Sequence, residues 1–103
     1  MVTLLSQRQI PTSNTKYTLS ESVSNFALIA IVCGWGNNNV LDTVVMPSSV
    51  WSSNKTDAMR LWVNRMPSAN IYVDVKSRTA TTLYCQSNNA NVYVGVYGIL
   101  RVN

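Results

Sequence analysis

Short stretches in which apolar and polar side chains alternate constrain this fold more than any other feature. Residues 71–76 and 92–97 alternate with a two-residue period, the period of a β-strand with one buried face. Residues 58–66 also alternate, although Ala, Met, Arg and Leu there leave a helix as the competing interpretation. Clusters of Gly, Pro, Asn and Ser separate about eight expected strands: 2–5, 16–19, 26–33, 40–46, 58–66, 71–76, 79–85 and 92–100.

This pattern predicts an all-β protein, an antiparallel β-sandwich or jelly roll of about eight strands. The 103 residues suffice for a single domain, residues 1–103. The apolar run Phe26–Cys33 predicts a central strand that is covered on both faces. At eight residues it is too short to cross a bilayer, so we expect no membrane insertion.

The polar surface is expected to be mostly neutral. Charged residues make up 12% of the chain, about half the usual share, and Ser, Thr and Asn replace them. Such a surface suits a protein that is largely covered by partners or that works outside cells. The net charge of +4 comes from scattered basic residues, so we expect no nucleic-acid partner.

The inventory of reactive side chains argues against catalysis. The chain has no His and only four acids, so the commonest general base is missing and we expect no catalytic residues. Cys33 and Cys85 lie in apolar segments, which favours two buried thiols, with a disulfide as the alternative. Two Cys without His cannot complete a zinc site, and we expect neither metal nor cofactor.

The remaining function for such a chain is binding. Trp gives a rigid contact area, and Asn both donates and accepts hydrogen bonds. The alternative for the Trp residues is that they anchor loops onto the core. The candidate receptor-binding residues lie in Asn- and Ser-rich stretches: Trp35, Asn37, Asn38, Asn39, Trp51, Asn88, Asn89 and Asn91.

A second candidate surface is aromatic. Four rings fall at positions expected on the outer sides of strands, namely Trp62, Tyr72, Tyr93 and Tyr97. Exposed rings of this kind indicate that both sheet faces are buried or that one face packs against another subunit. We favour the subunit interface in so small a domain.

Two segments resemble the C-terminal tip domains of bacteriophage tail fibres. The segment Tyr17–Ile29 (YTLSESVSNFALI) is similar to their aromatic-x-Leu-Ser-acid-Ser segment, followed by Asn-aromatic and an apolar strand. The segment Val94–Leu100 (VGVYGIL) looks like their last strand, and Thr3–Ser6 fits their opening strand. Residues 37–91 match only in their strand-and-loop texture.

The resemblance implies a homotrimer in the virion's tail fibre, assembled in the host cytoplasm. It implies adhesion to a bacterial surface glycan or outer-membrane protein, and it supplies no catalytic residue. The missing shaft indicates a fragment or a short, separately encoded tip. Two alternatives remain open: a structural virion subunit for decoration or tail assembly, and a carbohydrate-binding module.

Overall fold

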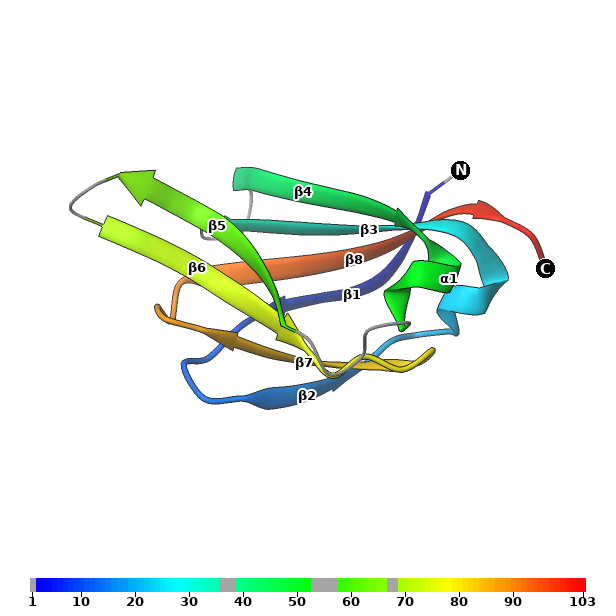
Figure 1. Ribbon diagram of the computed structural model, residues 1–103, viewed down its shortest axis with the longest axis horizontal. Coiled ribbons are helices and arrows are strands. Elements are labelled where there is room, and N and C mark those ends of the chain that lie inside the picture. The colour runs from blue at the N-terminus through cyan, green and yellow to red at the C-terminus, as the bar shows by residue number, and fades with distance from the viewer. Residues whose placement is uncertain (1, 36–38, 53–57, 67–68) are drawn as a thin grey trace.

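Eight strands form two packed antiparallel sheets in the computed structural model, which describes residues 2–35, 39–52, 58–66 and 69–103 (Figure 1). One sheet has the strand order β1-β8-β3-β4 and the other the order β2-β7-β6-β5. The elements are β1 (Val2–Gln9), β2 (Thr15–Thr18), η1 (Val23–Asn25), β3 (Phe26–Trp35), β4 (Asn39–Pro47), α1 (Ser48–Trp51), β5 (Met59–Met66), β6 (Ala69–Lys76), β7 (Thr82–Ser87) and β8 (Val92–Arg101). The predicted all-β sandwich of about eight strands is confirmed.

The competing helix over residues 58–66 is wrong, because this segment is β5 and pairs with β6. Leu61 and Val63 point into the core together, as the two-residue alternation predicts. A register shift between Trp62 and Asn64 interrupts the ladder. Tertiary pairing thus outweighs the helix propensity of the segment.

The core fills the space between the two sheets. Val73 and Val75 on β6 and Ile29 and Ile31 on β3 have no exposed surface. Side chains alternate along each strand. The residues between these buried ones therefore point outward and form the two outer faces of the sandwich. These outer faces are where the two sheets differ.

Cys33 on β3 and Cys85 on β7 are both buried thiols, which confirms the preferred expectation. Burial raises the pKa of the Cys85 thiol to about 12. Little reactive thiolate therefore forms at neutral pH.

The two segments that carry the tail-fibre resemblance lie side by side, since β3 pairs with β8. Arg101 closes the end of β8 with two hydrogen bonds to Glu21, of 2.8 and 2.9 Å. Asn25 donates to the same carboxylate at 3.0 Å. The ring of Phe26 occupies the space beside Gly98, where an added Cβ would come within 2.5 Å of it. The two motifs therefore form one structural junction.

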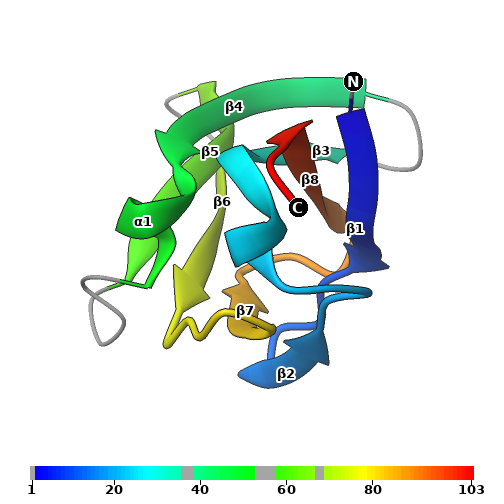
Figure 2. The same cartoon turned by 90° about the vertical axis from the view of Figure 1, so that its right-hand side faces the viewer.

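The sandwich has two dissimilar ends. Both termini, η1 and α1 lie at one end (Figures 1 and 2). The end of β3, the start of β4, the end of β5, the start of β6 and the connection between β7 and β8 lie at the opposite end, which we call the loop end.

Candidate functional site

Several predicted receptor-binding residues meet at the loop end. Trp35, the last residue of β3, pairs with Asn39 on one side and with Val92 on the other. Asn91 immediately precedes Val92 and is exposed. Asn37 and Asn38 lie outside the described residues.

The asparagines before β8 also hold the loop in shape. Asn88 is exposed; its Oδ1 accepts from the Tyr72 N–H at 2.9 Å and its Nδ2 donates to the Asn70 carbonyl at 2.7 Å. Asn89 Oδ1 accepts from the Asn91 N–H at 3.0 Å. These amides therefore fix the β7–β8 connection against β6.

Trp51 does not belong with this group, and its assignment to a receptor surface has to be corrected. It lies in α1 at the opposite end and is fully buried. Its Nε1 donates to the Thr79 carbonyl at 2.6 Å, and its own carbonyl accepts from Arg78 Nε at 2.6 Å. Trp51 therefore anchors α1 on the core, the alternative that the sequence left open. Trp35 is half-buried and packs against the core.

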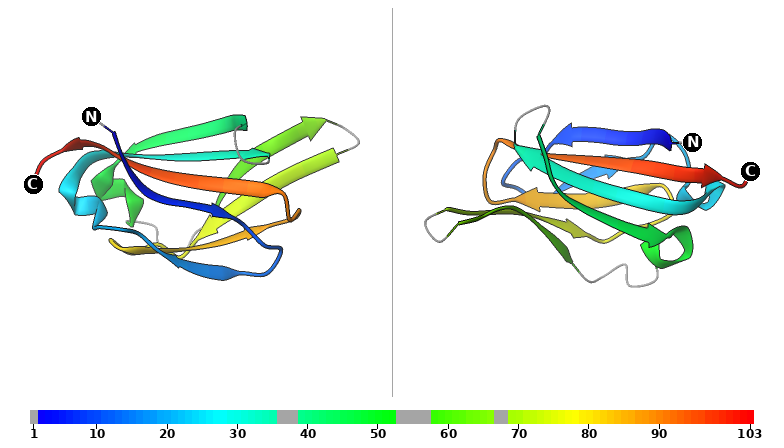
Figure 3. Two further views of the ribbon diagram at one scale, coloured as in Figure 1. Left: turned by 180° about the vertical axis from the view of Figure 1, so that it is seen from behind. Right: turned by 90° about the horizontal axis from the view of Figure 1, so that it is seen from above.

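The four outward aromatic residues divide between two faces. Tyr93 and Tyr97 lie on β8, in the sheet β1-β8-β3-β4, while Trp62 and Tyr72 pair across β5 and β6 in the other sheet. These sheets form opposite layers of the sandwich (Figure 3). The structure thus does not bring the four rings together on one surface.

The outer side of the sheet β1-β8-β3-β4, which we call the apolar face, is built almost entirely of uncharged, mostly apolar residues. Tyr93 extends it toward the loop end. Its rows across the four strands are Val2–Ile99–Leu28–Pro47, Leu4–Tyr97–Ala30–Val45 and Gln7–Gly95–Val32–Thr43. None of these described residues carries a charge.

The side chains of this face pack closely against one another, and the described residues form no layer over them. An added Cβ at Gly95 would come within 3.0 Å of both Tyr97 Cε1 and Val32 Cγ2, so these side chains close over the glycine. Leu4 is 48% exposed and Val45 is 54% exposed. The apolar run of β3 predicts cover on both faces, but among the described residues its outer side is covered only in part: Ala30 is buried, whereas Leu28 and Val32 are half-buried.

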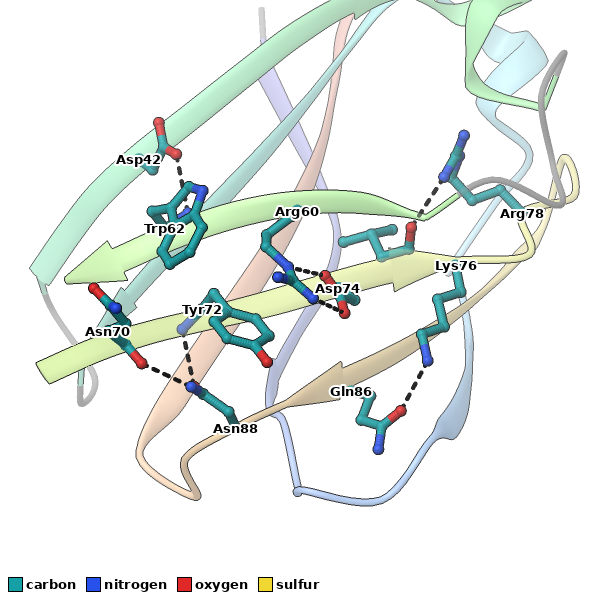
Figure 4. A network of polar contacts seen from close by, with 11 residues as sticks. Asp42, Arg60, Trp62, Asn70, Tyr72, Asp74, Lys76, Arg78, Gln86 and Asn88 are labelled. Carbon is teal, nitrogen blue, oxygen red and sulfur yellow. Dashed lines mark hydrogen bonds and ion pairs between the residues drawn. The ribbon is translucent and has the colours of Figure 1, made fainter. Parts of the chain in front are cut away.

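The outer side of the sheet β2-β7-β6-β5, which we call the aromatic-cationic face, has a different composition. Polar and charged side chains surround its rings (Figure 4). Its rows are Lys16–Tyr84–Lys76, Gln86–Asp74–Arg60 and Asn88–Tyr72–Trp62, where Asn88 is bonded to the Tyr72 backbone.

Arg60 organises this face. It donates to both carboxylate oxygens of Asp74, at 2.8 and 3.0 Å, and these bonds raise the pKa of Arg60. Its guanidinium carbon lies 3.8 Å from the centroid of the Tyr72 ring. Trp62 meets Tyr72 edge to face with ring centroids 5.3 Å apart. Lys76 Nζ donates to Gln86 Oε1 at 2.8 Å. Cross-strand contacts thus hold these side chains in place.

Comparison with known protein families, with curated proteins and with solved structures finds no match. The two outer faces and the loop end are therefore the basis on which a function is proposed.

Other features of the described residues are minor. Gln9, Pro11, Tyr17 and Ala90 line a shallow depression of about 430 Å³. Burial, followed by the neighbouring Cys85, raises the pKa of the Tyr17 hydroxyl. Within the described ranges, no three His, Cys, Asp or Glu residues gather in a way that could hold a metal ion. In that same part of the chain, no helix has the length and apolar character needed to span a membrane.

Proposed function

We propose that this chain is a receptor-binding tip domain of a bacteriophage tail fibre, which adheres to the bacterial surface as a homotrimer and without catalysis. The observation that carries the proposal is the apolar face. Its residues are mostly apolar, as in a protein interior, and the described part of the chain places no layer over them. The resemblance at residues 17–29 and 94–100 implies that the assembly is a trimer and that the protein is part of a phage tail fibre.

The size of the apolar face fits self-association. Four strands about 4.8 Å apart and about eight residues long, at about 3.3 Å per residue, present roughly 500 Å² in projection. This matches the largest apolar patch of a typical monomeric protein, about 300–600 Å², and patches of that size are often functional. Copies of one chain can cover such a surface for each other around a symmetry axis. Uncharged residues suit the dry centre of that interface.

The loop end supports the adhesive part of the proposal. It lies opposite both termini (Figure 1), so an apolar interface along the sheet would leave it accessible. Trp35 pairs there with Asn39 and with Val92, which follows the exposed Asn91. Asn side chains with a neighbouring aromatic ring suit a polar receptor.

The test is binding of fluorescently labelled protein to a panel of bacteria and to phage particles that lack tail fibres. We expect saturable binding to at least one bacterial strain. Within that strain, mutants without surface polysaccharide or without individual outer-membrane proteins identify the receptor class. Binding to the phage particles and to no bacterium would overturn the proposal in favour of a structural virion subunit.

A further inference from the structure

The aromatic-cationic face differs from an interface in its charge. Lys16 and Lys76 flank Tyr84 on either side across three neighbouring strands. Arg60 and Asp74 form an ion pair one row away. The described side chains of this face therefore carry three positive charges and one negative charge.

The same face offers the contacts that a sugar chain requires. Trp62, Tyr72 and Tyr84 are half-buried rings with flat apolar surfaces, on which the C–H faces of sugar rings can pack. Charged and amide groups beside them bind hydroxyl and carboxylate oxygens. The Arg60–Asp74 pair and the Lys76–Gln86 bond hold these groups before any ligand arrives, which lowers the entropy cost of binding.

From this arrangement we infer that the aromatic-cationic face binds an acidic polysaccharide, with Trp62 and Tyr84 stacking on sugar rings and Lys16 and Lys76 meeting the carboxylates. This inference rests on the proposed adhesive function and names the receptor class. It also places Trp62 and Tyr72 in the receptor-binding surface rather than in the subunit interface.

Two other occupants fit the face less well. A subunit interface would bury Lys16 and Arg60, whereas charged residues are depleted at interface centres. A single-stranded nucleic acid needs a track of unpaired cations along its phosphates. Here Asp74 sits in the middle of the face and pairs with Arg60, so only a few cations face the solvent.

The experiment is a glycan array that carries uronic-acid, sialic-acid and phosphate-bearing bacterial glycans beside neutral ones, with a poly-dT oligonucleotide as an additional probe. We expect binding to acidic glycans that weakens with salt. Trp62→Ala should raise the dissociation constant at least about tenfold, because Trp is a frequent anchor of binding sites. Lys76→Gln should weaken binding and reduce its salt dependence.

Arg8→Gln is the matched control, because it removes one exposed positive charge from β1 and should leave glycan binding unchanged. Thermal unfolding confirms that each variant folds, and Trp62→Leu replaces Trp62→Ala if the latter does not. The inference would be overturned if the protein bound no acidic glycan. It would also be overturned if Arg8→Gln lost as much glycan binding as Lys76→Gln, or if the protein bound poly-dT more tightly than any acidic glycan.

Whole-cell binding separates this inference from the proposed function. Unchanged adhesion of Trp62→Ala and Lys76→Gln to a strain that the unmodified protein binds would overturn the inference alone. Absence of adhesion by the unmodified protein to every strain would overturn the proposed function itself.

Discussion

The two outer faces of this sandwich are built on the same strand alternation and differ in what that alternation displays. On the apolar face, Val32 and Tyr97 close over Gly95, and no described side chain is charged. On the aromatic-cationic face, Arg60 is fixed between the Asp74 carboxylate and the Tyr72 ring. The first arrangement gains stability by losing water, whereas the second keeps its charges hydrated. The difference supports the proposal that one face serves association and the other recognition.

The largest expected effect comes from placing a charge on the apolar face. Val45→Glu puts a carboxylate at a position that is 54% exposed in one chain, so folding of the monomer should tolerate it. Burying that charge in a subunit interface should cost several kcal/mol, which is enough to dissociate the proposed trimer. Light scattering coupled to size exclusion should show a monomer.

Thr18→Glu is the matched control on the opposite sheet, because Thr18 is exposed on β2. It should leave the molar mass unchanged. If both variants kept the mass of the unmodified protein, or if both lost it, the distinction between the faces would fail.

A smaller effect distinguishes the inner and outer sides of β8. Gly98→Ala would place a Cβ 2.5 Å from the buried ring of Phe26, and overpacking of this kind costs about 1–3 kcal/mol in the free energy of unfolding. The nearest atoms to an added Cβ in Gly95→Ala belong to the side chains of Tyr97 and Val32 on the outer face, at 3.0 Å, so this substitution should cost less. Urea unfolding of the two variants measures the difference, and an equal loss would contradict it.

The smallest effect concerns the ion pair at the end of β8. Hydrogen bonds from Arg101, and then from Asn25, lower the pKa of Glu21 from its ordinary value near 4.5 to about 2. A lowered folded-state pKa stabilises the protein above pH 4.5, and this contribution disappears as the pH falls toward 2. Glu21→Gln should therefore be less stable than the unmodified protein at pH 7 and equal to it near pH 2.

Thermal unfolding across this pH range measures the convergence. Because Glu21 lies at the strand end and outside the apolar face, the molar mass of Glu21→Gln at pH 7 should not change. A constant stability difference from pH 7 to pH 2 would rule out this role for the ion pair.

Much of the fold was predictable because strand periodicity is local. The alternation in 71–76 and 92–97 marked β6 and β8, and the turn residues between segments separated the strands. The pairing of strands depends on contacts between distant parts of the sequence. The alternation alone therefore could not predict that Tyr93 and Tyr97 lie in one sheet and Trp62 and Tyr72 in the other. The chain changes sheets between β4 and β5 and again between β7 and β8, which places β5 and β6 in the sheet opposite β8.

The candidate sites were predicted less completely. Trp51 resembled a loop aromatic because Ser and Asn surround it, but its hydrogen bond to Thr79, 28 residues away, draws it into the core. The row of Lys16, Tyr84 and Lys76 was missed, since only the pairing of β2 with β7 and of β7 with β6 assembles it. The alternation did place Lys76 and Arg60 on the outward, polar sides of their segments. This was the one sign in the sequence that they belong to an exposed face.

The central claim is that the apolar face is covered by further copies of this chain. Its most direct test is the molar mass of the unmodified protein at micromolar concentration, measured by sedimentation equilibrium. We predict about three times the 11.4 kDa of one chain, unchanged in high salt because the face carries no described charge. A strict monomer at that concentration would contradict the claim.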